Sequence, residues 1–152
     1  MSNLNTRFGT LEFNEDDIVT LAEGLVGFPN LTRFLVLEHK PGSPFRWLQS
    51  VDEVATAFLV ANPSHYVPNF ELALPDAHVA RLGLTPDTAT LVFTTVTIPH
   101  GRPDDMTLNL AGPIVINLET RRGRQVVLEN EAYTTQHRVF PKADQHDSDA
   151  AA

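Results

Sequence analysis

The stretch at residues 107–128, TLNLAGPIVINLETRRGRQVVL, decides the fold of this chain. Apolar side chains recur at every second position through most of it, on both sides of a Gly-Pro break, and asparagines fall on the opposite parity. A period of two is typical of a β-strand, because successive side chains of a strand point to opposite faces. Gly112-Pro113 indicates a bulge, a bend or an edge, since proline lacks the N–H that a central strand needs.

The second half of this stretch predicts a hairpin. Residues 120–123, TRRG, read as a compact polar turn, in which Gly123 can adopt the positive φ that hairpins often need. Residues 125–128 would then form the return strand.

Outside this hairpin the chain reads as further short strands separated by turn residues. The strands expected from alternation and composition are residues 6–13, 18–21, 33–38, 45–50, 57–61, 67–72 and 90–98. Residues 23–29 are punctuated by two glycines and a proline, which favours a tight loop that buries Leu25 and Phe28.

Residues 74–83 are the best helix candidate. Asp76 can serve as the N-cap or as an acid of the first turn, Val79 and Leu82 share one face, and Gly83 fits the position just after the last turn. Residues 130–140 fit either a last short helix or an irregular strand.

These elements predict an all-β protein with minor α content. We expect a small antiparallel β-barrel-like single domain over residues 1–140, with one or two short helices; a sandwich of the same strands is the alternative. Residues 141–152, PKADQHDSDAAA, are polar and predict an acidic disordered tail.

Composition narrows the function classes. The 152 residues carry a formal net charge of −8, which disfavours a dedicated nucleic-acid binder. The absence of cysteine removes disulfides, cysteine-ligated metals and thiol nucleophiles. No apolar run resembles a signal peptide or reaches the length of about 20 residues that spans a bilayer, so we expect a cytoplasmic protein without membrane contact.

The polar clusters favour solvated surface over chemistry. The acidic groups fall in turns or the tail, and the six histidines form none of the usual metal-binding pairs. Arg121, Arg122 and Arg124 could hold a phosphate, but an exposed hairpin tip is the favoured interpretation. We therefore predict no catalytic residue, no cofactor site and no metal site.

Some apolar and amide residues have two interpretations. Phe28, Phe45 and Trp47 are either core residues or anchors for a partner. The amides Gln49, Asn109 and Asn117 lie inside apolar strands, where each must either cap a neighbouring turn or meet a partner.

Four segments together resemble the FliW family of flagellar assembly factors. They are EGLVGFP at residues 23–29, FRWLQSVD at 45–52, AF followed by NP across 57–63, and TLNL with PIVIN and QVVL across 107–128. Each segment alone is a weak signal, but the four occur in the family's order and span most of residues 6–133.

The resemblance implies a small β-barrel without enzymatic activity. FliW proteins bind CsrA, a dimeric RNA-binding repressor of translation, and also flagellin; the two partners compete, so that CsrA is kept from flagellin mRNA until flagellin displaces it. A monomer is the simplest state. The residues expected to contribute to partner binding are Leu25, Val26, Phe28, Trp47, Gln49, Glu71 and Asn109.

Two other functions remain open at this point. A small-ligand-binding or catalytic β-barrel of another family would need an interior pocket lined by histidines or acids. An oligonucleotide-binding barrel would need aromatic and basic side chains interleaved on one strand face, for which only Arg46 between Phe45 and Trp47 is a hint.

Overall fold

The computed structural model describes residues 2–70, 72, 74–129 and 132–140, so Glu71 and the expected tail at 141–152 lie outside the described residues. The elements are β1 (Ser2–Thr6), β2 (Gly9–Phe13), η1 (Glu15–Asp17), β3 (Val19–Leu21), β4 (Arg33–Glu38), β5 (Phe45–Ser50), β6 (Ala57–Ala61), η2 (Pro63–His65), α1 (Asp76–Leu82), β7 (Thr90–Thr97), η3 (Pro103–Asp105), β8 (Thr107–Leu108), β9 (Ile114–Asn117), β10 (Arg122–Gln125) and β11 (His137–Arg138).

Seven strands close into a barrel. Their order is β7-β6-β5-β4-β3-β10-β9, and β9 pairs back onto β7 to complete the ring. Every pairing in it is antiparallel except that of β3 with β10, where Thr20 lies opposite Arg122 in a parallel ladder. The predicted all-β, barrel-like fold is therefore confirmed, with one parallel contact that the hairpin pattern did not predict.

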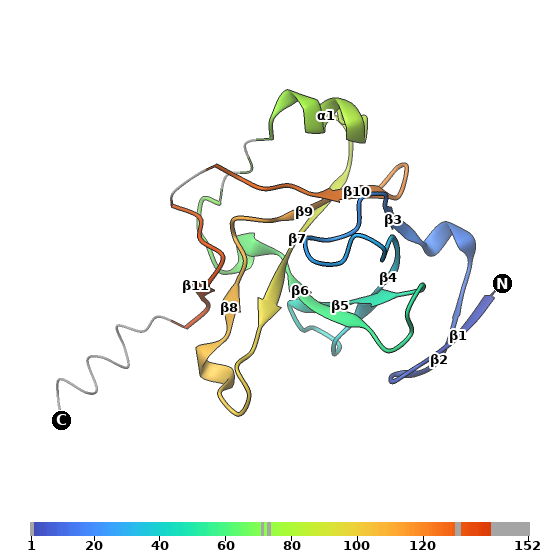
Figure 1. Ribbon diagram of the computed structural model, residues 1–152. Helices are drawn as coiled ribbons and strands as arrows, with labels where there is room; N and C mark the ends of the chain where they lie inside the picture. The colour runs from blue at the N-terminus through green and yellow to red at the C-terminus, as the bar shows by residue number, and fades with distance from the viewer. Residues whose placement is uncertain (1, 71, 73, 130–131, 141–152) are drawn as a thin grey trace.

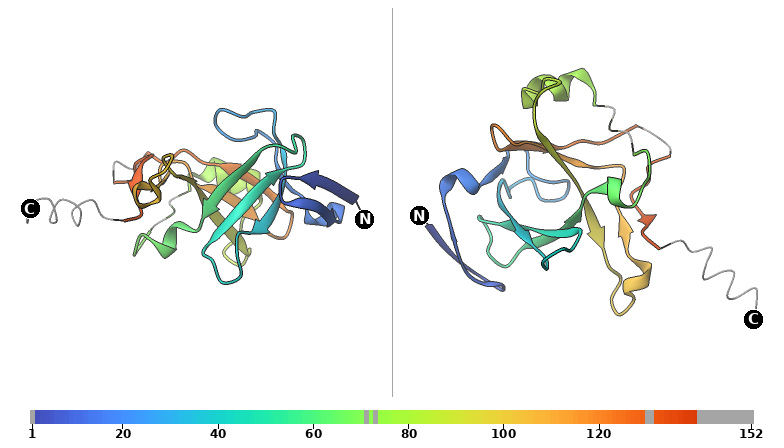
Figure 2. Two further views of the ribbon diagram at one scale, coloured as in Figure 1. Left: turned by 90° about the horizontal axis from the view of Figure 1, so that it is seen from below. Right: turned by 180° about the vertical axis from the view of Figure 1, so that it is seen from behind.

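Two strand pairs and the helix lie outside the ring. Figures 1 and 2 show the β1–β2 hairpin and the short β8–β11 pair on opposite sides of the barrel, with α1 across one end of it. Helix α1 covers Val115 and Val126 with its buried Leu82, and it ends at Gly83 in the left-handed conformation, as predicted. Within the described residues, no helix has the length and apolar character to cross a membrane.

The barrel interior is apolar because alternate side chains of each strand point inward. Its largest fully buried residues include Phe34 of β4, Leu48 of β5 and Ile116 of β9. Smaller apolar clusters lie outside the wall, one beneath the β1–β2 hairpin and one beneath the segment that follows β6.

The hairpin that decides the fold forms with a different turn from the predicted one. Strand β10 begins at Arg122, so the turn lies at 118–121, and it is Arg121 that has positive φ, at 60°. Gly123 is a strand residue instead. A Cβ there would lie 2.8 Å from the Val115 carbonyl oxygen and 2.9 Å from Leu21 Cδ2, so glycine is needed for close approach and not for a turn.

Other expected elements differ in their details. Residues 6–13 are not one strand, because Gly9, at a φ of 98°, ends a turn that divides them into β1 and β2. The described part of 67–72 forms turns instead of an extended strand. Residues 130–140 were predicted to form either a short helix or an irregular strand. The strand is found at β11, which pairs with β8.

Candidate partner-binding surface

The loop between β3 and β4 forms a tight, glycine-dependent turn. Leu25 and Phe28 exchange two backbone hydrogen bonds, of 3.2 and 2.7 Å, with Val26 and Gly27 at the tip. Gly24 has a φ of 68°, and a Cβ there would strike the Phe28 carbonyl oxygen and lie 2.7 Å from Pro29 Cα. The sequence pattern of two glycines and a proline thus fixes the shape of this loop.

The loop buries one apolar residue and presents two. Leu25 joins the barrel core and is only 4% exposed, whereas Val26 is 71% exposed and Phe28 is 44% exposed. The prediction that both Leu25 and Phe28 are buried is therefore wrong for Phe28. Its ring packs edge-on against Phe58, with centroids 5.0 Å apart, and leaves its other side open.

A groove of about 270 Å³ runs beside the loop. It is lined by Leu25, Val26, Phe28, Phe58, Leu59, Thr95, Val96, Thr97, Asn109 and Gln125. The groove lies at the point where β6 and β7 separate, because these strands pair only at Val60 with Thr95 and Ala61 with Thr94. Four of the predicted partner-binding residues, Leu25, Val26, Phe28 and Asn109, are thus brought together.

Two interactions hold the loop against β10. The Val26 amide donates a 2.7 Å hydrogen bond to Gln125 Oε1, and Gln125 Nε2 donates one of 2.9 Å to the Gly112 carbonyl. Glu23 pairs with Arg124 at 2.8 Å and with Arg81 of α1 at 3.2 Å. The exposed tip therefore stands on a fixed base.

Trp47 lies next to the groove on the outer wall. It stands between Leu37 of β4 and Leu59 of β6 in the strand register, and Leu59 also lines the groove. The Phe8 and Trp47 rings lie with their centroids 5.3 Å apart, and Arg7 Cζ lies 5.0 Å from the centroid of the Trp47 ring. Trp47 thus extends the apolar surface from the groove toward the β1–β2 hairpin.

The two predicted partner-binding amides outside the loop cap local turns. Gln49 is fully buried, and its Nε2 donates to the carbonyls of Val54, Ser50 and Thr56. Asn109 Oδ1 accepts from the Gly112 amide, yet the residue still lines the groove. We retain Asn109 in the proposed surface and omit Gln49, which exposes nothing in this conformation.

Asp52 is a structural residue that sequence reasoning passed over. It accepts hydrogen bonds from the Thr32 amide at 2.9 Å and the Arg33 amide at 3.1 Å, and it pairs with the Arg33 guanidinium at 2.9 Å. Burial alone raises the pKa of this carboxyl, but the Thr32 and Arg33 interactions outweigh burial and lower the pKa. Asp52 thereby ties the β5–β6 turn to the start of β4.

Sequence reasoning also missed the roles of Glu23, Gln125 and two arginines. Arg124 was expected at a solvated tip, but its side chain is only 17% exposed and pairs with Glu23. Arg121 donates to the Asp17 carbonyl at 3.1 Å, and only Arg122 of the three is exposed. Within the described residues, no group of three or more histidines and acids could hold a metal ion.

Comparison with known proteins agrees with this architecture. The family model described as FliW protein matches residues 3–139. A flagellar assembly factor FliW from Magnetococcus marinus is 44% identical over 136 residues, which cover 90% of this chain and 83% of that relative. One from Natranaerobius thermophilus is 35% identical over 140 residues, covering 92% and 93%.

A solved structure gives the same result. The crystal structure of a flagellar assembly factor FliW superposes with a TM-score of 0.85 at 36% identity, and the match covers 93% of this chain and 99% of that one. Both the barrel and the loop with its groove lie within the matched residues, and the chain belongs to the FliW family.

Proposed function

We propose that this protein acts by binding alone, as an antagonist of the translational repressor CsrA whose second partner is flagellin. Bound to the protein, CsrA is kept from flagellin mRNA; flagellin, once it accumulates, displaces CsrA and so limits its own synthesis. The proposal includes a cytoplasmic site of action and a monomeric protein. It rests first on family membership, since the matched relatives are named flagellar assembly factors.

The observation that carries the proposal is the exposed apolar tip of the β3–β4 loop. Val26 and Phe28 expose apolar surface beside a groove, and the loop is fixed from below by Gln125 and Glu23. An anchor that is already ordered loses little conformational entropy when a partner binds. Preordered apolar anchors beside a hollow are characteristic of protein-binding surfaces.

Charge supports the choice of a basic partner. The chain has a formal net charge of −8, and Glu15, Asp16 and Asp17 are exposed together on η1. A basic, RNA-binding partner would be attracted to such a surface. Once bound, the acidic protein would repel RNA phosphates at short range, an effect that salt should screen.

Isothermal titration tests the proposal directly. The purified protein should bind purified CsrA and, separately, purified flagellin. Flagellin added to the complex with CsrA should lower the apparent affinity for CsrA, and CsrA should lower that for flagellin by the same factor, because coupling between two ligands is reciprocal. Absence of binding to both partners would overturn the proposal. If both partners bind but neither changes the affinity for the other, flagellin does not displace CsrA.

A further inference from the structure

A second hollow, of about 250 Å³, lies on the other side of the β3–β4 loop. The loop forms one wall, and Arg124 and Gln125 of β10 form the other. This hollow shares Leu25, Val26 and Gln125 with the apolar groove. The two hollows therefore form one continuous surface around the exposed loop tip, apolar on one side and lined by charged groups on the other.

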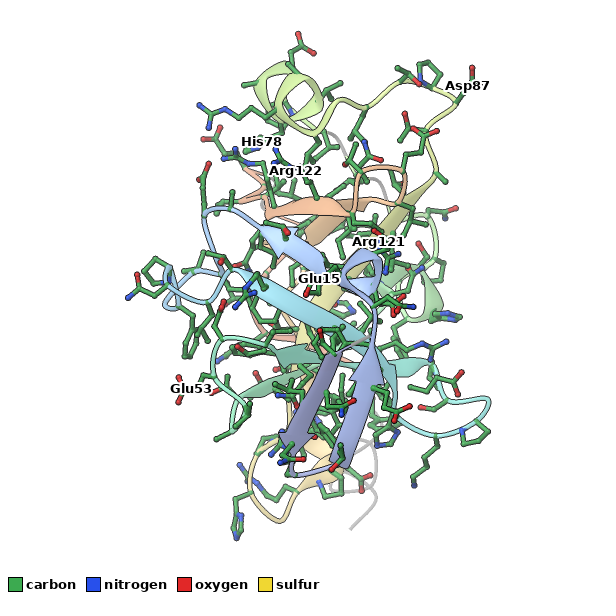
Figure 3. All side chains as sticks on the ribbon, turned by 90° about the vertical axis from the view of Figure 1, so that its right-hand side faces the viewer. Glu15, Glu53, His78, Asp87, Arg121 and Arg122 are labelled. Carbon is green, nitrogen blue, oxygen red and sulfur yellow. The ribbon has the colours of Figure 1, made fainter. Side chains whose placement is uncertain are left out.

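The charged side has an excess of cations. Arg124 Nη1 and Arg81 Nη1 both pair with a single oxygen, Oε1 of Glu23, at 2.8 and 3.2 Å. Arg122 is exposed on the same face of β10 as Arg124, and Figure 3 shows it with His78 where β10 meets α1. Two guanidinium groups, those of Arg81 and Arg124, thus share one carboxylate, on a chain that is otherwise strongly acidic.

Arg124 is short of hydrogen-bond acceptors. Its side chain is 17% exposed, and among the described residues Nη1 meets an acceptor, Glu23 Oε1, whereas Nε is buried without one. A guanidinium carries five N–H donors in a planar fork that matches a carboxylate. Removing such a group from water without enough acceptors is unfavourable, so an incoming carboxylate would supply what the protein itself does not.

We propose that Arg124, assisted by Arg81, binds a side-chain carboxylate of an acidic protein segment whose neighbouring apolar side chain occupies the groove beside Phe28. The inference rests on the proposed function and assigns this surface to one of its two partners. The arginines would repel the basic surface of an RNA-binding repressor, so the segment belongs to the other partner, flagellin. CsrA would then engage the acidic surface elsewhere.

Substitution of the arginines tests this assignment. At low salt, Arg124→Gln should weaken binding of purified flagellin about tenfold and reduce the salt dependence of binding. Arg81→Gln, at a side chain that is 64% exposed and remote from the core, should weaken it about threefold. Arg102→Gln is the matched control, because it removes the same charge from a 70% exposed side chain beside η3, and it should leave binding unchanged.

Glu23→Gln separates carboxylate binding from simple support of the loop. Both Glu23→Gln and Arg124→Gln remove the ion pair that holds the loop, but Glu23→Gln also removes the carboxylate that competes for Arg124. Glu23→Gln should therefore retain or strengthen flagellin binding at low salt. Equal weakening by both variants would show that Arg124 only supports the loop, and would overturn the inference. If the unmodified protein binds no flagellin, the proposed function itself has failed.

Discussion

Phe28 of the β3–β4 loop packs edge-on against Phe58 of β6, with ring centroids 5.0 Å apart. Phe58 in turn lies 6.3 Å from Phe34, which is fully buried in the barrel. The three rings connect the exposed loop to the core. The surface proposed to bind a partner is thus an outward continuation of the barrel interior.

Phe28→Ala should reduce partner binding with little loss of stability, because the ring is 44% exposed. We expect affinity to fall about tenfold or more for the partner that uses the groove, as for other aromatic anchors. Phe140→Ala is the matched control, since that ring is 47% exposed and lies outside the groove. Titration of both variants against CsrA and flagellin makes the comparison; equal behaviour would remove the groove from the interface.

Gly24→Ala should destabilise the protein more than Gly27→Ala. Both glycines have positive φ, which costs a non-glycine residue on the order of 1 kcal/mol. At Gly24 a Cβ also strikes the backbone of Phe28 and Pro29, whereas at Gly27 it meets nothing within 4 Å. Urea unfolding measures the difference, and equal losses for the two variants would contradict the described loop.

Gln49→Leu should lower the free energy of unfolding by about 2 kcal/mol. The substitution keeps the side-chain volume but leaves the Val54 carbonyl without its side-chain donor and weakens the turn at 51–56. Amide hydrogen exchange should accelerate in that turn. Unchanged exchange there, with unchanged stability, would show that the buried amide is not what holds the turn.

Asp52 should make stability fall in acid. Its folded-state pKa is lowered below the ordinary aspartate value of 3.8, so its contribution is fully present above that value and is lost as pH falls through the lower, folded pKa. Asp52→Asn should therefore be less stable than the unmodified protein at neutral pH, and the gap should narrow in acid. Glu53→Gln, next to it and exposed (Figure 3), is the control and should show no such pH-dependent gap. A gap that stays constant with pH would contradict the assignment.

The sequence predicts most of the strands, because alternation reports directly which side chains face the core. Residues 33–38, 45–50 and 57–61 form β4, β5 and β6 with the expected bounds. Gly123 shows where such reasoning ends. A glycine after a polar run is consistent with a turn, and only the packing of Leu21 against β10 reveals that it serves close approach instead.

The candidate surface was predictable in part. The glycines and proline of residues 24–29 indicate a shaped loop, but not which of its apolar residues points outward. That depends on Phe58, which supports one side of Phe28. The pairing of Glu23 with Arg124 joins positions far apart in the chain, and no local pattern marks such a contact.

The parallel ladder between β3 and β10 has a consequence for synthesis on the ribosome. Val19–Leu21 is synthesised long before Arg122–Gln125, the strand that pairs with its second edge. The ring therefore cannot close while the polypeptide is still being elongated through its middle. Contacts of such long sequence separation slow folding, so this edge of β3 stays unpaired in the nascent chain until Arg122–Gln125 has been translated.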